Sequence, residues 1–199
     1  MRIIGILGGV ASGKSAVAQQ FARLGAGVLD ADRAGHETLR LPRIEAAARQ
    51  RWGETIFTAD GRIDRGRLAQ IVFAKTPQAE RERNYLEQLT HPEITRLLQQ
   101  QAEAMAATGA AIVVLDAPLL LESGWADLCE KTVFVEASSG VRLERAIARG
   151  WTKEEFAARE AAQESLERKR RLADAIIDNS GSPQRTQAQV EQFWASLLR

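Results

Sequence analysis

A glycine-rich stretch near the N-terminus carries the clearest chemistry. Residues 8–15 have the sequence GGVASGKS, which fits the pattern Gly-x-x-x-x-Gly-Lys-Ser/Thr. Gly8 and Gly13 allow backbone torsions and close approaches that a Cβ would block, so successive N–H groups can point at phosphate oxygens. Lys14 would add a mobile positive charge, and the Ser15 hydroxyl could ligate Mg²⁺. The pattern predicts a phosphate-binding loop, because a plain glycine turn would rarely match all four fixed positions.

Three aspartates follow apolar runs that are expected to be strands. Asp30 and Asp32 come after Val28–Leu29, and Asp116 comes after the β-branched run Ala111–Leu115. In α/β proteins the carboxyl end of a strand faces the ligand crevice, so these carboxylates are candidates for catalysis or metal binding. Asp116 matches the position that binds Mg²⁺ directly or through water in phosphate-loop enzymes. The alternative for each is a helix-capping or structural role.

The third candidate set is basic. Arg142, Arg145 and Arg149 lie on one expected helix, capped by Ser138 or Ser139. Arg145 and Arg149 are four residues apart and therefore share a face of that helix. A phosphoryl-transfer enzyme needs cations opposite its phosphate-binding loop, which favours a functional role for this pair.

Five short apolar segments predict the strands that position these residues. The first precedes the glycine loop, and a helix is expected directly after the loop. The run Ala111–Leu115 is typical of a fully buried parallel strand. The strands are expected near residues 3, 28, 112, 132 and 175.

The segment between the second and third strands shows helix signals and no strand signals. Asp64 can cap a helix, and Pro77 and Pro92 each suit a first helical position. Residues 43–109 therefore predict a helical insertion. Later in the chain, Thr152 and Glu155 predict a capping box. Helices are expected over Arg33–Leu41, Arg43–Trp52, Arg65–Ala74, Pro77 to about Leu89, Pro92 to near Gly109, Ser139–Arg149, a solvated and highly charged Glu154–Arg171, and onward from Pro183.

Composition limits the class of protein. The chain has 199 residues, 45% hydrophobic and 27% charged, with a net charge of +1, so no global charge favours nucleic acid or a membrane surface. One cysteine, Cys129, excludes an internal disulfide and fits a reducing compartment; it is expected to be a small buried residue. No signal peptide is visible, and the apolar stretch Ala110–Leu121 is too short to cross a bilayer. We expect a cytoplasmic protein, a monomer or weak homo-oligomer.

Several segments together are more specific than the glycine loop alone, and their order resembles the dephospho-coenzyme A kinase family. The resemblance covers the chain from Ile3 to about Trp194. The segments that carry it are GGVASGKS (8–15), DADRAGH (30–36), DGRIDR (60–65), HPEI (91–94), DAPLLLE (116–122) and ADAIIDN (173–179).

The resemblance implies an α/β fold: a P-loop, nucleoside-kinase-like three-layer core with a five-stranded parallel sheet, a helical substrate-binding insertion and a helical lid. The core would comprise residues 1–42, 110–137 and 172–199. The coenzyme A-binding insertion would be residues 43–109, and the lid residues 138–171. The implied reaction transfers the γ-phosphoryl group of ATP, with Mg²⁺, to the ribose 3′-hydroxyl of dephospho-coenzyme A, the last step of coenzyme A synthesis.

The resemblance also implies roles for individual residues. Asp32 would be the base, and Lys14, Arg145 and Arg149 would act on the phosphates. Ser15 and Asp116 would hold the metal. The acceptor would contact Asp32, His36, Arg65, His91, Pro118 and Leu119. The nucleotide would contact Gly8, Gly9, Ala11, Ser12, Gly13, Lys14, Ser15, Ala16, Asn179 and Gly181.

Two positions depart from the family pattern. Ala11 stands where the family usually has glycine, which requires that its torsions remain allowed. Arg142 stands where the lid usually has glutamine, and the usual Pro-x-Glu before it is missing, so the lid assignments are weaker than those in the loop.

Competing functions remain at this stage. A related phosphate-loop kinase could act on a nucleotide or another small metabolite, but the DADRAGH and HPEI segments argue against it. A GTP-dependent switch would need an Asn-Lys-x-Asp motif, which the sequence lacks. A regulator without chemistry is disfavoured by the intact Lys14, Ser15, Asp32 and Asp116.

Overall fold

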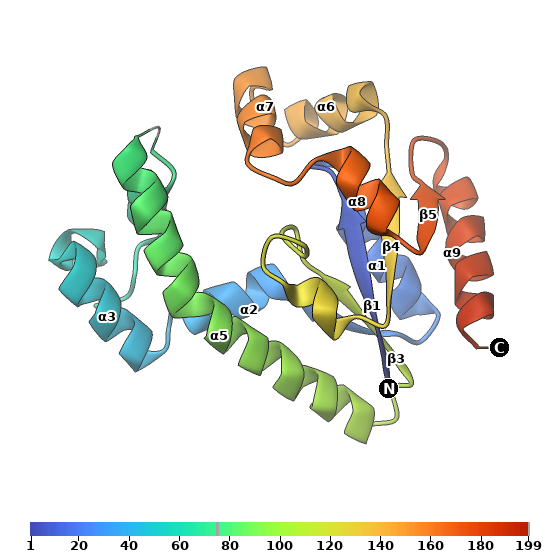
Figure 1. Cartoon of the computed structure of the whole chain (residues 1–199), viewed down its shortest axis with the longest axis horizontal. Coiled ribbons are helices and arrows are strands. Elements are labelled where there is room, and N and C mark those ends of the chain that lie inside the picture. Colours follow the sequence, from blue (N-terminus) through green and yellow to red (C-terminus); the bar gives the residue numbers. More distant parts are fainter. Residues whose placement is uncertain (75, 199) are drawn as a thin grey trace. The chain divides into compact units, whose positions relative to one another are not determined.

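The computed structural model describes residues 1–74 and 76–198. Within them, five strands form one sheet in the order β2-β3-β1-β4-β5, and every neighbouring pair is parallel. The predicted five-stranded parallel sheet is therefore confirmed (Figure 1). The strands are Arg2–Gly8 (β1), Gly27–Asp30 (β2), Ile112–Asp116 (β3), Lys131–Glu136 (β4) and Ala175–Asp178 (β5).

The sheet is covered on both faces. On one face, alternate strand residues such as Ile4, Val114 and Val135 pack with Phe21 of α1 (Lys14–Arg23) and Val190 of α9 (Pro183–Leu197). The helix expected from Pro183 joins this cluster through its apolar residues, because Leu197 is buried in it while Phe193 and Trp194 pack against it.

The opposite face is covered by α8 (Leu166–Leu172), which packs against β1 and β4, and by the segment after β3. At Gly5 in the central strand, a Cβ would lie 2.6 Å from Leu120 and 2.8 Å from the Cys129 sulfur. A larger residue at position 5 would therefore collide with this covering layer.

The chain divides into two compact units, residues 1–31 with 101–199 and residues 32–100. The first contains the sheet. The second is helical, with a core of Ala48, Ile56, Phe57, Leu68 and Val72. Its elements include α2 (Ala31–Thr38), α3 (Pro42–Trp52), η1 (Glu54–Ile56), α4 (Arg65–Val72) and most of α5 (Pro77–Ala107). The predicted division into core 1–42, 110–137 and 172–199, insertion 43–109 and lid 138–171 stays a prediction.

The predicted helix caps are present. The Asp64 carboxylate accepts hydrogen bonds from the N–H groups of Gly66 and Arg67, and Ser138 caps α6 (Ser139–Ala148). Thr152 and Glu155 form the predicted capping box of α7 (Lys153–Ala161). These caps form because each side chain satisfies N–H groups that have no partner within the helix.

One helix break predicted at Pro92 is wrong. Residues Pro77–Ala107 form a single helix with Pro92 inside it. Proline removes one N–H donor, but its fixed φ is compatible with a helix. Ile94 and Leu98, one turn apart just beyond it, are both buried, and this burial holds the helix together across the missing bond.

A second prediction, of one solvated helix over residues 154–171, is also wrong. The segment forms α7 and α8 with a turn between them. The Glu164 N–H donates to the Glu122 carboxylate at 2.7 Å, and Ser165 caps α8 by accepting from the Arg168 N–H. Lys169 is 1% exposed and is therefore not solvated.

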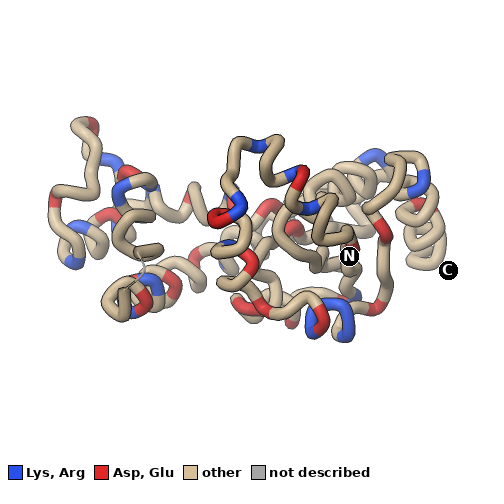
Figure 2. Tube along the Cα trace, turned by 90° about the horizontal axis from the view of Figure 1, so that it is seen from above, with Lys and Arg blue, Asp and Glu red and all other residues tan. Residues whose placement is uncertain are grey.

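Charged residues of both signs are interspersed along the trace (Figure 2), which agrees with the near-zero net charge. Within residues 1–74 and 76–198, no helix is both long and apolar enough to cross a membrane.

Candidate active site

The glycine loop lies between β1 and α1, in the strand–loop–helix context that the sequence predicts. Gly8 has φ +154° and Gly13 has φ +96°, backbone conformations that L side chains rarely adopt. A Cβ at Gly13 would lie 2.2 Å from the Asn179 amide nitrogen. Gly13 is therefore required both by its torsion and by the close approach of Asn179.

Ala11 lies in the left-handed region with φ +58° and is 8% exposed. It is the only non-glycine residue of positive φ in the part of the chain that the structure describes. Ala11 and Val10 pack against Ala146 of α6 and Phe156 of α7. Alanine at this position thus adopts a left-handed torsion, and it packs in a cluster with residues of α6 and α7.

Lys14, Ser15 and Asp116 meet at the carboxyl end of the sheet. The Lys14 ammonium donates to the carbonyls of Gly8 at 3.1 Å and Gly9 at 3.0 Å. The Ser15 hydroxyl lies near enough to the Asp116 carboxyl group to favour its ionised form. Asp30 at the end of β2 pairs in register with Asp116 at the end of β3. Two carboxylates, a hydroxyl and an ammonium group are therefore gathered where phosphate and a metal ion would need them.

Asp116 has an unusual electrostatic environment. Burial raises its pKa, and the neighbouring Asp30 carboxylate adds to this effect. The Ser15 hydroxyl and the Lys14 charge act in the opposite direction, but the net pKa is above the ordinary range. A half-buried carboxylate beside a second one is a place where a bound cation would be favourable.

Arg145 connects the loop to the end of β5. Its guanidinium donates to the Ser12 carbonyl at 3.0 Å and to the Asn179 carbonyl at 2.8 Å. The Asn179 side-chain amide donates to the same Ser12 carbonyl at 2.7 Å. The predicted loop residue Ser12, lid residue Arg145 and adenine-side residue Asn179 are thus brought together.

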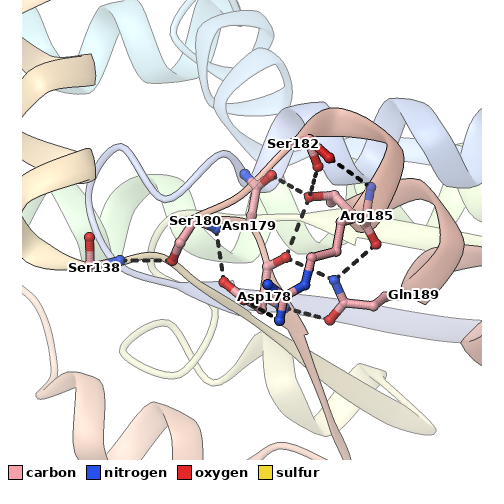
Figure 3. A network of polar contacts seen from close by, with 8 residues as sticks. Ser138, Asp178, Asn179, Ser180, Ser182, Arg185 and Gln189 are labelled. Atoms are coloured by element: carbon pink, nitrogen blue, oxygen red, sulfur yellow. Dashed lines mark hydrogen bonds and ion pairs between the residues drawn. The ribbon is translucent and has the colours of Figure 1, made fainter.

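The segment after β5 is held by its own polar network (Figure 3). The Asn179 amide oxygen accepts from the Thr186 hydroxyl at 2.9 Å, and the Ser180 N–H donates to Asp178 at 2.9 Å. Gln189 exchanges two hydrogen bonds with the Asp178 backbone. This network fixes the Asn179 side chain against the glycine loop, while Gly181 lies exposed in the turn that follows.

The other two arginines of α6 differ from Arg145. Arg149 caps the helix end, is exposed, and makes no side-chain hydrogen bond or ion pair within the described residues. Arg142 is 4% exposed and points into the unit, with contacts to Ala137, Val10 and Glu160.

The predicted acceptor-side residues fall into two groups. Pro118 and Leu119 follow β3 in the first unit and are half-buried. In the second unit, Asp32 and His36 lie exposed on α2, Arg65 is the exposed first residue of α4, and His91 is half-buried in α5. These residues stay predictions.

With this geometry in hand, the comparison with known proteins is specific. A family model described as dephospho-CoA kinase matches residues 2–185. The chain belongs to the dephospho-CoA kinase family.

Relatives match over nearly the whole length. A dephospho-CoA kinase of Bacillus licheniformis is 39% identical over 201 residues, which cover 98% of both chains. The crystal structure of TT1252 from Thermus thermophilus has a TM-score of 0.85 at 34% identity and covers 100% of this chain and 98% of its own. The structure of a dephospho-CoA kinase from Campylobacter jejuni has a TM-score of 0.72 at 25% identity, covering 99% and 98%.

Membership in the dephospho-CoA kinase family confirms the predicted fold class and makes the chain a kinase with a nucleotide as phosphoryl donor and an alcohol group as acceptor. It also explains why the glycine loop, Asp116 and the turn after β5 lie together. These are the parts of a P-loop kinase that meet at one end of the sheet.

Sequence reasoning missed a buried polar cluster in the unit that contains the sheet. Lys169 pairs with Glu122 at 3.0 Å and donates to Gln163 at 3.1 Å, which ties α8 to the loop after Leu119. Burial opposes ionisation of Glu122, but the hydrogen bond from the Glu164 N–H and the Lys169 charge bring its pKa below the ordinary range. Charge runs alone gave no signal for this pair; the only hint was that Glu122 is the last residue of the DAPLLLE segment.

Proposed function

We propose that this member of the dephospho-CoA kinase family transfers the γ-phosphoryl group of ATP to the ribose 3′-hydroxyl of dephospho-coenzyme A. The observation that carries the proposal is the meeting of Lys14, Ser15 and Asp116 at the carboxyl end of a parallel sheet, in a chain of this family. The product would be coenzyme A, and the reaction would be the last step of its synthesis.

On the donor side, we assign nucleotide binding to Gly8, Gly9, Ala11, Ser12, Gly13, Lys14, Ser15 and Ala16. N–H groups at a helix N-terminus favour an anion, and Lys14 adds a point charge. Asn179 and Gly181 are assigned to the adenine. The support for Asn179 is its hydrogen bond to the Ser12 carbonyl, which places it at the edge of the loop.

A magnesium ion fits the residues present. Mg²⁺ prefers oxygen ligands, and Ser15 and Asp116 offer a hydroxyl and a carboxylate that lie near each other. When bound, the ion would neutralise phosphate charge. The Asp116 carboxylate would be a charged ligand of the ion. Its burial and the nearby Asp30 carboxylate make the ionised form of Asp116 unfavourable unless a cation is bound.

On the acceptor side, we assign Asp32 as the base that accepts the proton of the ribose hydroxyl and aims its oxygen. His36, Arg65, His91, Pro118 and Leu119 are assigned to acceptor binding. Arg145 and Arg149 are assigned to the phosphates, and Arg145 already reaches the loop at the Ser12 carbonyl. We place the enzyme in the cytoplasm, as a monomer or weak homo-oligomer.

The test is turnover of purified protein with ATP and dephospho-coenzyme A, with and without Mg²⁺, following coenzyme A by mass spectrometry. We expect Mg²⁺-dependent formation of coenzyme A and ADP. Nucleoside monophosphates and shikimate serve as competing acceptors, and Lys14→Ala as the inactive control. Preferred phosphorylation of another acceptor, or turnover that survives Lys14→Ala, would contradict the proposal.

The assignment of the base has its own test. Asp32→Asn keeps the shape of the side chain but removes its basicity, so kcat should fall about 10²–10⁴-fold with the Kd for ATP little changed. Asp30→Asn is the matched control two residues away and should cost less. An inactive Asp30→Asn beside a normal Asp32→Asn would assign the base to Asp30.

A further inference from the structure

Arg142 is a buried cation that touches three different elements of the first unit. It is 4% exposed. Its Nε donates to the Ala137 carbonyl after β4 at 3.1 Å, and its Nη1 donates to the Val10 carbonyl in the glycine loop at 3.4 Å. The same Nη1 pairs with Glu160 of α7.

The surroundings of Arg142 fit it closely. Its guanidinium carbon lies 5.6 Å from the centre of the Phe156 ring, and a Cβ at Gly9 would lie 2.9 Å from Nη1. Burying a guanidinium is costly unless it is paired and hydrogen-bonded. Here Glu160 supplies the charge and two carbonyls supply acceptors.

The contact with Val10 bears on the conformation of the loop. In a trans peptide the C=O and N–H groups point in opposite directions, so a carbonyl held by Arg142 turns the Ala11 N–H away from the guanidinium. Ala11 itself is in the left-handed region with φ +58°, which an alanine adopts only when its surroundings impose it. Arg142 is the polar part of those surroundings, and the contacts of Ala11 with Ala146 and Phe156 are the apolar part.

We propose that Arg142 is a positioning residue for ATP: with Glu160, it ties α6 and α7 to the Val10–Ala11 peptide and keeps the glycine loop in its phosphate-binding conformation. The proposal rests on the proposed function, since it assumes that the loop binds ATP. It goes beyond that function by giving a role to a residue outside the proposed nucleotide contacts. Glutamine, which is usual at this position in the family, could hydrogen-bond a carbonyl but could not pair with Glu160.

The main test is Arg142→Gln, with the Kd for ATP measured by calorimetry and the KM values for ATP and dephospho-coenzyme A by turnover. We expect the Kd and KM for ATP to rise about 10-fold, as for loss of a charge-assisted contact, with the KM for the acceptor within twofold of wild type. Arg159→Gln is the matched control. It is another lid arginine stacked on an aromatic ring, Trp151, at 4.2 Å, and it should leave both values unchanged.

Glu160→Gln gives an independent measurement in case Arg142→Gln folds poorly. Glu160 has a side chain 28% exposed, so its substitution should leave a folded protein, with the Kd for ATP raised about 2- to 5-fold. The double variant should bind ATP no more weakly than Arg142→Gln alone, because both substitutions break the same ion pair between Arg142 and Glu160.

The outcomes separate the two proposals. Wild-type protein without coenzyme A formation would contradict the proposed function. Active wild type, with ATP affinity within twofold in both Arg142→Gln and Glu160→Gln, would overturn the role of Arg142. So would a lower melting temperature with unchanged ATP affinity, since Arg142 would then be structural only.

Discussion

At the scale of single residues, Asp116 shows how a proposed metal ligand can cost stability. Its carboxylate is half-buried near Asp30, and burial raises its pKa although Ser15 and Lys14 act in the opposite direction. A carboxyl group whose pKa is higher in the folded state than in the unfolded chain destabilises the fold once it is ionised. At pH values above the carboxyl pKa of the unfolded chain, Asp116 therefore opposes folding in the absence of a cation.

Asp116→Asn should for this reason raise the melting temperature at pH 7 without nucleotide and metal. The same substitution removes the proposed metal ligand, so Mg²⁺-dependent turnover should fall on the order of 10²-fold. Thermal unfolding with and without Mg²⁺ and steady-state kinetics check both effects. Asp127→Asn, an exposed carboxylate on η2 (Trp125–Leu128), is the control and should change neither. Unaltered turnover in Asp116→Asn would show that Asp116 is not a ligand of the metal.

Ala11 permits a measurement of backbone strain. Ala11→Gly removes the strain of a left-handed alanine, which should stabilise the folded protein by roughly 1–2 kcal/mol. Two effects act in the opposite direction: the loss of a buried methyl group, about 0.8 kcal/mol, and the greater conformational entropy of glycine in the unfolded chain. These effects nearly cancel, so the free energy of unfolding should change by less than about 1 kcal/mol. Urea unfolding measures it.

The control lies in the same apolar cluster. Ala146 on α6 is 0% exposed, and Ala146→Gly loses a similar methyl in a helix interior. It should destabilise by about 1.5–2 kcal/mol, the sum of the methyl and the helix propensity of glycine. Equal losses at the two positions would mean that Ala11 carries no strain.

At the scale of elements, the sequence predicted best what depends on local residues. The five strands follow from apolar runs, because a parallel strand is buried on both faces. The caps at Asp64, Ser138 and Thr152 follow from side chains that bond neighbouring N–H groups. For the site, the loop and its strand–helix context could be predicted for the same reason.

The features that could not be predicted from the sequence depend on contacts between residues that are distant along the chain. The helix continues through Pro92 because Ile94 and Leu98 are buried, and the break between α7 and α8 depends on the Glu122 carboxylate. The same holds for Lys169, which lies in the charge run predicted to be solvated, and for Arg142, whose burial no local pattern indicates. Both make tertiary ion pairs. A charge run does not encode which of its members has a buried partner.

The two arginines predicted to share a face of α6, Arg145 and Arg149, should behave differently. Arg145→Ala removes hydrogen bonds to the carbonyls of Ser12 and Asn179, so it should destabilise the fold by about 1–3 kcal/mol and weaken ATP binding. Arg149→Ala should leave the stability within about 0.5 kcal/mol of wild type and lower kcat through lost phosphate contact. Thermal unfolding and kcat for each variant distinguish the two. If Arg149→Ala keeps full kcat, only Arg145 belongs to the site.

At the scale of the whole molecule, the candidate residues divide between the two compact units. The glycine loop, Asp30, Asp116, Arg145 and Asn179 belong to the unit with the sheet, and the acceptor candidates Asp32, His36, Arg65 and His91 belong to the helical unit. The single cysteine belongs to the first unit, where its sulfur packs against Gly5 of the central strand. Its thiol therefore reports on unfolding of the sheet.

Burial raises the pKa of the Cys129 thiol to about 12, whereas an unfolded chain has a thiol pKa of about 8.5. Between these values the unfolded chain releases the proton and the folded protein retains it, so stability falls as pH rises, by up to about 1.4 kcal/mol per pH unit. Cys129→Ser removes this titration and keeps a donor for the Trp125 carbonyl, which the thiol contacts at 3.6 Å. Urea unfolding at pH 7.5 and pH 10 should show wild type losing about 2 kcal/mol more than Cys129→Ser. An equal loss in both proteins would mean that the thiol ionises as easily in the folded state as in the unfolded chain.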